Sequence, residues 1–241
     1  LQERRAVAAF VSWPNAVVRT YRAAYAGLPR DAWLLALLEL VNRSGTMVLF
    51  FLTLYLTRQL GFSVVEAGYV MSAYGLGSML GTYLGGRLCD RLGAYHVQKL
   101  SLAASAALLV LLQLPRGPWL MGALVLVLAA FQDALHPANA AATAQICSPE
   151  LRAKGFALHR LAANLGFSIG PVVGGYLAQW DYRAIFWGDG LTALVAFVVA
   201  LVFLPSAGPQ VAAAVRASAR TRPAWRDFGF VKLLPLVFGI G

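Results

Sequence analysis

Long apolar runs alternate with short polar breaks along most of the chain. A helix needs roughly 20 residues, each adding about 1.5 Å, to cross the hydrocarbon core of a bilayer. Breaks such as Pro115-Arg116-Gly117-Pro118 and Ser148-Pro149-Glu150 end the runs. The pattern predicts an all-α membrane protein whose first helix is capped by Asp31. Its six spanning helices are expected at residues 32–56, 65–86, 97–114, 119–145, 155–178 and 184–204.

Polar segments flank this bundle, which we place at residues 31–204. Residues 1–30 are basic and interleaved with aromatic side chains, which fits either a solvated tail or an amphipathic segment on anionic lipid. They lack the compact apolar core of a cleavable signal peptide. Residues 205–229 form a polar loop by composition, and residues 230–241 open a truncated seventh helix. We therefore expect a fragment of a longer membrane protein.

The basic residues between the runs are distributed unevenly. One alternating set of junctions holds 14 Lys and Arg, five within residues 1–30, three at 87–99, two at 147–154 and four at 205–229. The opposite set holds three, namely Arg58, Arg116 and Arg183. Positive residues collect on the cytoplasmic side of membrane helices. The chain is therefore expected to be a multi-pass protein of the cell (cytoplasmic, or inner) membrane with a cytoplasmic amino terminus.

Composition agrees with lipid as the solvent. The 241 residues are 59% hydrophobic and 12% charged, whereas soluble domains carry about 25% charged residues. The net charge of +10 lies in the gaps between apolar runs and forms no stripe on a polar fold, so we expect no nucleic-acid partner. Cys89 and Cys147 lie in two polar junctions on the same predicted side and are expected to be reduced and structural.

The second and fifth runs both carry glycines at every fourth residue, a spacing that lines one helix face and lets another helix approach closely. Small residues are common in membrane helices, so this alone also fits ordinary packing. Paired ionisable residues recur in the first and fourth runs as well, so runs one to three match runs four to six. Two three-helix units of opposite orientation are typical of half a transporter. The glycines are Gly77, Gly81 and Gly85, and Gly166, Gly170 and Gly174.

Glu39 and Arg43 are the ionisable pair of the first run. Four residues apart, they lie on one helix face. An Arg near the bilayer centre costs about 2.5–3.5 kcal/mol even on insertion scales, so it must face a partner or a water-filled cavity. The pair fits either a neutralised packing contact or, as we favour, a binding site.

Asp133 and His136 are the corresponding pair of the fourth run, followed by Pro137, which is expected to bend the helix and expose a carbonyl. Asp and His together could bind and release a proton in a transport cycle. The alternative is that both lie hydrated near the cytoplasmic end. Asn164 and Asp189 are weaker candidates.

An enzyme is not expected. The string Gly166-Phe167-Ser168-Ile169-Gly170 matches a nucleophile elbow, but it lies within an apolar helix and not between a strand and a helix. The three histidines lack metal-ligand spacing, and there is no glycine-rich phosphate loop. We therefore predict no catalytic residue, cofactor or metal.

The stretch from Gly86 to Lys99 predicts a tight charged turn between two helices. Its Gly86, Asp90, Arg91 and Gly93 follow a Gly-x-x-x-Asp-Arg-x-Gly spacing that resembles the loop motif of the major facilitator superfamily. Asp90 is expected to accept backbone hydrogen bonds at a helix start and to pair with Arg87 or Arg91. The segment Gly166–Gly175 is similar to part of that superfamily's antiporter motif.

A weaker similarity is to the proton-dependent oligopeptide transporters. It is carried by Glu39-Leu40-Val41-Asn42-Arg43, His136-Pro137-Ala138-Asn139 and Asn164-Leu165-Gly166. The resemblance covers about half of such a transporter, its amino-terminal six-helix bundle.

The resemblance implies a twelve-helix fold, alternating access and proton coupling. The implied partners are a small-molecule substrate, protons, membrane lipid and a missing carboxyl-terminal bundle. It implies a substrate and proton-coupling site at Glu39, Arg43, Asp133, His136 and Asn164, with Glu39 or Asp133 as proton carrier. The loop residues Gly86, Asp90, Arg91 and Gly93 would hold the outward-open state against the missing bundle. A multidrug efflux antiporter and a non-transporting receptor or assembly protein are the alternatives.

Overall fold

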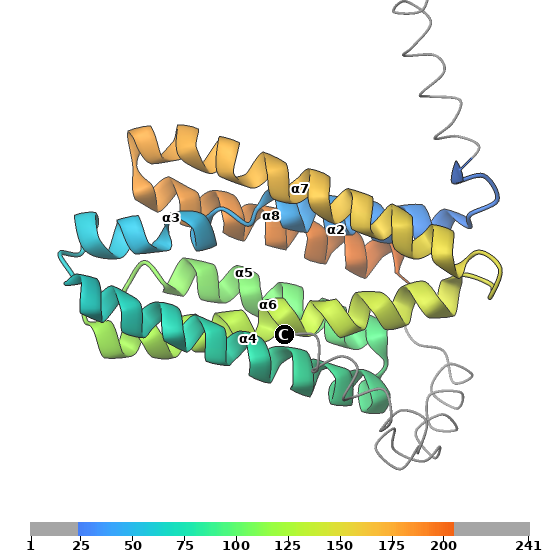
Figure 1. Ribbon diagram of the computed structural model, residues 1–241, viewed down its shortest axis with the longest axis horizontal. Helices are drawn as coiled ribbons and strands as arrows, with labels where there is room; N and C mark the ends of the chain where they lie inside the picture. The colour runs from blue at the N-terminus through green and yellow to red at the C-terminus, as the bar shows by residue number, and fades with distance from the viewer. Residues whose placement is uncertain (1–23, 205–241) are drawn as a thin grey trace, which may run out of the picture.

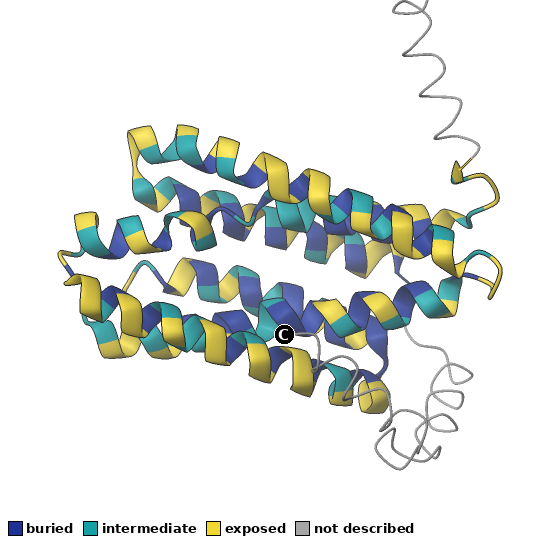
Figure 2. Cartoon of the chain, viewed as in Figure 1, coloured by how far each residue is buried: buried dark blue, intermediate teal, exposed yellow. Residues whose placement is uncertain are grey.

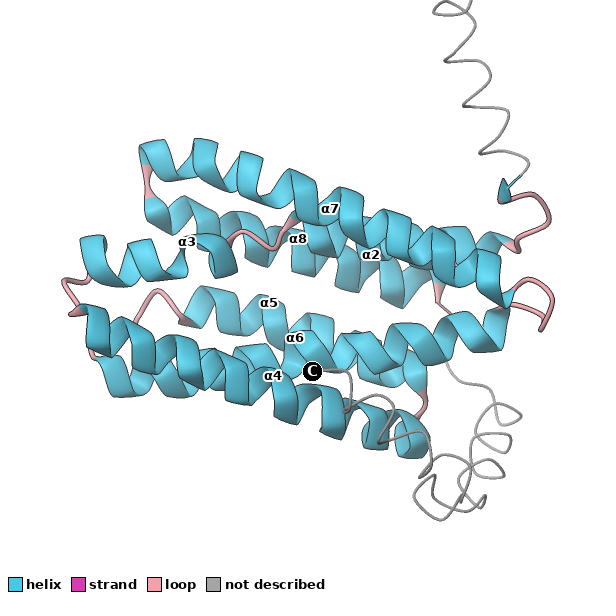
Figure 3. Ribbon diagram, viewed as in Figure 1, coloured by secondary structure: helices cyan, strands magenta, loops and turns pink. Residues whose placement is uncertain are grey.

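The computed structural model describes residues 24–204, and every element in that range is a helix (Figures 1 and 3). The expectations for residues 1–23, 205–229 and 230–241 lie outside the described residues. The elements are α2 (Arg30–Ser44), α3 (Val48–Leu54), the π-helical turn η1 (Tyr55–Gln59), α4 (Val64–Leu92), α5 (Ala94–Leu111), α6 (Pro118–Ile146), α7 (Arg152–Trp180) and α8 (Tyr182–Phe203).

Five helical segments of the described range are long and apolar enough to cross a membrane. They are Arg30–Gln59, which joins α2, α3 and η1, and then α5, α6, α7 and α8. The 29 residues of α4 also suffice, at about 1.5 Å each, to cross a bilayer. Its many Gly, Ser and Tyr residues make it less apolar than the other five. With α4, these segments account for the six expected spans.

Successive spans run in opposite directions along the long axis of the bundle (Figure 1), with α2, α3 and η1 together forming the first span. The start of α2, the end of α4 and the α6–α7 junction lie together at one end, and the α5–α6 and α7–α8 junctions lie at the other. Each of the six spans therefore crosses the bundle from one end to the other, as a multi-pass membrane protein requires.

Large apolar side chains cover the outside of the bundle. Exposed residues follow the outer sides of α4 and α7 (Figure 2). Examples are Met79 on α4, 72% exposed, and Val172 on α7, 74% exposed. Water would penalise apolar patches of this extent, whereas acyl chains would not. The backbone polar groups are bonded within the helices, as lipid demands.

The glycine stripes are the main interhelical contacts, and they follow the repeat. A Cβ at Gly81 on α4 would collide with the backbone of Ala130 on α6, and one at Gly166 on α7 would collide with the backbone of Leu40 on α2. Thus α4 packs on α6 as α7 packs on α2. In both pairs, the second helix of one three-helix unit packs on the first helix of the other unit. The same contact therefore occurs twice, which confirms two matching repeats.

The first span differs from the prediction of one continuous helix. It breaks at Gly45-Thr46-Met47 between α2 and α3 and ends in the π-helical turn η1. A Cβ at Gly45 would collide with the side chain of Thr192 on α8, so the close approach of α8 fixes the break. Asp31 is not the N-cap. Pro29 takes that position in an extended conformation, and Asp31 lies in the first turn, where its charge complements the helix dipole.

The charged turn is also shorter than predicted. Helix α4 continues through Arg87, Asp90 and Arg91 to Leu92, and α5 begins at Ala94. Only Gly93 separates them, with φ of 88°, a conformation that glycine adopts without strain. Pro137, which was expected to bend its helix, lies inside α6, and the helix runs on to Ile146. Packing against α4 and α5 keeps α6 helical despite the lost hydrogen bond.

Candidate functional site

Glu39 and Arg43 form an ion pair inside the bundle. Arg43 Nε donates to Glu39 Oε1 at 2.9 Å, and the Glu39 side chain is 4% exposed. The four-residue spacing on α2 puts both on one face. Glu39 lies nine residues into α2, about 14 Å at the helical rise. The carboxylate is therefore neutralised by the one cation that the helix spacing places beside it.

His136 of α6 faces the free end of this guanidinium. Arg43 Nη2 lies 2.9 Å from Nε2 and 3.2 Å from Nδ1 of His136. A guanidinium only donates hydrogen bonds, so a ring nitrogen that bonds to it must accept, and in a neutral imidazole one nitrogen accepts while the other donates. His136 Nε2 also lies 3.3 Å from Asp133 Oδ1. The pairs expected separately on two helices thus form one cluster.

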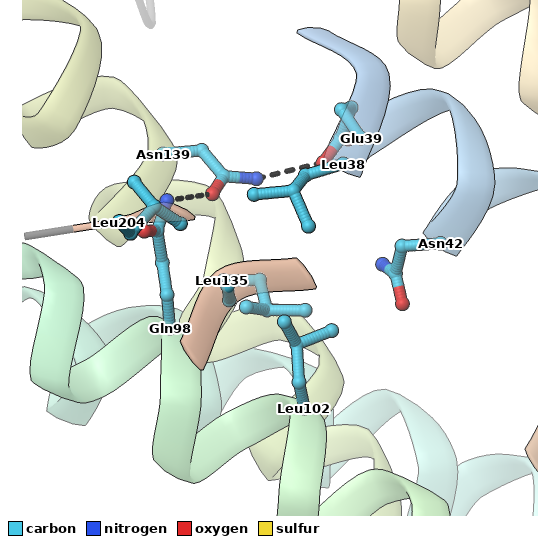
Figure 4. A pocket seen from close by; sticks show the side chains of 9 residues that line it. Leu38, Glu39, Asn42, Gln98, Leu102, Leu135, Asn139 and Leu204 are labelled. Carbon is cyan, nitrogen blue, oxygen red and sulfur yellow. Dashed lines mark hydrogen bonds between the residues drawn. The ribbon is translucent and has the colours of Figure 1, made fainter. Parts of the chain in front are cut away.

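A buried chain of amides joins the cluster to α5. Asn139 Nδ2 on α6 donates to Glu39 Oε2 at 2.7 Å, and Gln98 Nε2 on α5 donates to Asn139 Oδ1. Figure 4 shows the three side chains end to end. Both oxygens of Glu39 are therefore hydrogen-bonded. The side-chain oxygen of Gln98, Oε1, is buried without a partner beside a cavity of about 20 Å³ that Asn42 also lines, a volume sufficient for one water.

His159 brings a third helix, α7, to the same carboxylate. Its Nε2 lies 3.9 Å from Glu39 Oε1, and its Nδ1 is buried without a partner. Toward the surface, the cluster opens through the His136 side chain, which is 51% exposed, and through Arg43, which is 18% exposed. The polar cluster is therefore buried at Glu39 and exposed at His136.

Asn164 and Asp189 do not join the cluster. Asn164 is exposed on α7, where its carbonyl accepts from Ser168 Oγ at 2.8 Å. Asp189 of α8 is buried and instead accepts a hydrogen bond from the backbone nitrogen of Val48 at 3.2 Å, at the start of α3.

The residues of the charged turn lie apart from the cluster, at the end of α4. Asp90 and Arg91 are exposed, and within the described range Asp90 makes no ion pair. The expected pairing is wrong, since Arg87 lies over the ring of Tyr83, 4.6 Å from its centroid. Asp90 does not cap the start of α5 either, because Gly93 holds the N-cap position and no side chain bonds to it there. It does line an open groove of about 710 Å³ with Arg152 of α7.

This groove brings the α4–α5 turn and the α6–α7 junction to the same side of the bundle. Lys154 Nζ also reaches the Ala26 carbonyl at 3.5 Å, so the residues before α2 lie there too. At the junction, hydrogen bonds from its own backbone and from Ser148 lower the pKa of Glu150, and burial raises the pKa of the Cys147 thiol. Within residues 24–204, the basic residues that the sequence assigned to one side therefore lie at one end of the bundle, namely Arg30, Arg87, Arg91, Lys99, Arg152 and Lys154.

Sequence reasoning missed Gln98 and His159 as members of the site. Gln98 is a polar residue near the start of an apolar helix, but it was assigned to the predicted charged turn, which extended to Lys99. His159 was considered only as a metal ligand. His159 reaches Glu39 directly, and Gln98 reaches it through Asn139. Both links depend on how separate helices pack together, so the spacing of residues along the chain does not predict them.

A comparison with family models and a comparison with curated proteins agree with each other. The family model described as the Major Facilitator Superfamily matches residues 33–241. Similar curated proteins include solute carrier family 22 member 18 of Mus musculus, 30% identical over 73% of this chain and 43% of its own length. The multi-drug resistance efflux pump PmrA homolog of Lactococcus lactis is 30% identical over 60% of this chain and 37% of its own.

The multidrug resistance protein MdtH of Photorhabdus laumondii is 26% identical over 75% of this chain and 43% of its own length. The chain thus spans less than half the length of these relatives. The match of the family model covers the whole helical bundle described above. The chain therefore belongs to the Major Facilitator Superfamily, a family of membrane transporters and not of enzymes.

Proposed function

We propose that the chain is the amino-terminal half of a proton-coupled secondary transporter that moves a small organic solute by alternating access. The observation that carries the proposal is the contact between Arg43 and His136, which joins the ionisable pairs of the two repeats in one cluster, buried at Glu39 and exposed at His136. Ionisable residues at this depth are costly in a membrane and mark solute or proton pathways. A site at the interface of two repeats is the usual arrangement in such transporters.

The cluster can couple protonation to solute binding. While His136 is neutral, its ring accepts from Arg43, and the guanidinium is shared between His136 and Glu39. A proton on His136 ends that acceptor role and places a second positive charge beside Arg43, while Asp133 at 3.3 Å stabilises the imidazolium. Arg43 is then free to bind an acidic or hydrogen-bonding group of a solute. Glu39 and Asp133 are the carboxylates that accept the proton in turn.

Asn164 has a different place in the proposal. Its exposed position on α7 suits a contact with the solute or with the other half of the transporter and does not suit proton transfer within the cluster.

Gly86, Asp90, Arg91 and Gly93 are proposed to contact the missing carboxyl-terminal bundle on the cytoplasmic side. Support comes from the exposure of Asp90 and from the groove that it shares with Arg152. The count of basic residues supports a cytoplasmic amino terminus in the inner membrane. A reporter fused to the amino terminus of the full-length protein tests the orientation, because it should be shielded from external protease in intact cells.

Multidrug efflux is the second candidate function. It is favoured by the names of two relatives, the PmrA homolog and MdtH. Both candidates use the proton gradient, but an antiporter moves solute and protons in opposite directions, whereas a symporter moves them together.

Proton flux on solute addition separates these readings. The full-length protein is reconstituted in liposomes that contain a pH-sensitive dye, and a panel of anionic, zwitterionic and lipophilic cationic solutes is added. The proposal expects a solute-dependent pH change that disappears in Arg43→Gln. Arg160→Gln, the same change at an exposed arginine on α7, should behave as wild type. Absence of any solute-dependent pH change would favour the non-transporting receptor or assembly protein.

A further inference from the structure

The break in the first span rests on a single acidic side chain of another helix. Val48 begins α3, and its backbone nitrogen donates to Asp189 Oδ2 at 3.2 Å. The other oxygen, Oδ1, lies against Gly45, the first residue after α2. Asp189 is seven residues into α8, about 10 Å at the helical rise, so it lies within the membrane. The carboxyl group thus occupies the gap in the broken helix.

No cation accompanies this carboxyl group. Asp189 is 4% exposed, and among residues 24–204 its ion pairs with Lys, Arg or His number none. Glu39, equally buried, has Arg43 at 2.9 Å. An uncompensated ionised carboxylate in an apolar interior is far costlier than the neutral acid, and backbone donors offset only part of that cost. Of Glu39 and Asp189, Asp189 is the one that its surroundings favour as the acid.

The described residues around Asp189 are mostly uncharged. Tyr74 of α4 lines the same small cavity and is its other titratable side chain, while Gln132 of α6 and Thr46 of the break are polar and uncharged. On the α5 side, the neighbouring Gly190 faces the apolar Leu109. Toward α7, Gly188 faces Leu177.

The cavity beside Asp189 is small and closed. Its volume is about 10 Å³, close to the lower limit for one water. A proton can therefore reach or leave Asp189 only when the surrounding helices move. The break at Gly45–Met47 is the element whose movement would admit water, because its backbone is not held in a continuous helix.

We propose that Asp189 is a proton-binding site separate from the Glu39–Arg43–His136–Asp133 cluster, loaded while α3 is seated on it and exchanging with water when the broken span moves. The reaction is the reversible transfer of one proton between water and a carboxylate oxygen, so no other reactant is needed. In the acid form Oδ2 still accepts from Val48. In the ionised form the charge draws water into the gap and favours the opened break. The inference rests on the proposed proton coupling, but its test requires no transport.

Infrared difference spectroscopy of the purified full-length protein tests the proposal. At neutral pH the wild type should show a carboxylic-acid carbonyl band that is absent in Asp189→Asn and present in Glu39→Gln, since Glu39 is ionised beside Arg43. Asparagine is a good capping residue, so the variant should keep the bond to Val48. Asp189→Glu should keep a band at a shifted frequency, and aspartate-specific carbon-13 labelling should shift the wild-type band.

Two results would overturn the assignment. One is a wild-type spectrum without the band, and the other is a band that persists unchanged in both Asp189 variants. If Asp189→Asn does not fold, the Asp189→Glu shift and the isotope shift decide. If the band behaves as expected but the protein shows no proton-driven flux, the proposed proton coupling is rejected and Asp189 remains a proton-binding site. If the protein shows proton-driven flux but no band, the proton coupling stands and Asp189 is rejected as a proton-binding site.

Discussion

Asn139 donates a hydrogen bond to Glu39 across 2.7 Å, although the two residues lie 100 positions apart in the chain. Asn139 belongs to the first helix of the second repeat, and Glu39 belongs to the first helix of the first. The bond therefore joins the repeats at the centre of the bundle, and it occupies the carboxylate oxygen that Arg43 leaves free.

Replacing Asn139 should destabilise the bundle. In Asn139→Leu, Glu39 Oε2 and Gln98 Nε2 lose their buried partners, and each unsatisfied group costs about 1–3 kcal/mol. The free energy of unfolding in detergent titrations should fall accordingly. Asn164→Leu, at an exposed position on α7, is the matched control and should leave it nearly unchanged. Equal stabilities for the two variants would show that the amide chain is not formed.

Removing Arg43 alone should lower the free energy of unfolding more than removing both members of the ion pair. Arg43→Met leaves Glu39 buried without its cation, a loss of about 3–5 kcal/mol in comparable cases. The double variant Glu39→Leu, Arg43→Met removes both charges and should regain part of that stability. Unfolding of the two single variants and the double variant gives the coupling. Additive losses would contradict a direct interaction between the two side chains.

The α4–α6 interface should tolerate no side chain at Gly81. A Cβ there would collide with the backbone of Ala130, and overpacking of this kind costs about 1–3 kcal/mol. Gly75 on the same helix has nothing within 4 Å of its Cβ position. Thermal unfolding should therefore place Gly81→Ala below the wild type and Gly75→Ala at or above it, since alanine is the better helix former. The reverse order would refute the packing described here.

Much of this fold is readable from the chain. Apolar runs of membrane length and glycines at every fourth residue depend only on local spacing, and both appear in the structure as predicted. The ionisable pairs Glu39–Arg43 and Asp133–His136 were likewise found from their spacing within one helix turn.

What sequence reasoning missed depends on contacts between distant segments. The residues of α3 are as apolar and helix-compatible as those around them, so the break before Val48 leaves no local trace. It is fixed by Thr192 and Asp189 of α8, and the Val48–Asp189 bond joins residues 141 positions apart. The link from Gln98 to Glu39 through Asn139 similarly requires three helices in register. The length of the turn at Gly93 was overestimated because a run of charged residues is typical of a loop, whereas here these residues form the last turns of α4.

The central claim is that the Arg43–His136 cluster faces water and not lipid. Cysteine labelling tests it most directly, in the full-length protein with its native cysteines replaced and reconstituted in membranes. His136→Cys should react with a membrane-impermeant, water-soluble maleimide. Leu191→Cys, which lines an apolar groove between α5 and α8, should react only with a lipid-soluble reagent. Labelling of His136→Cys by the lipid-soluble reagent alone would contradict the account.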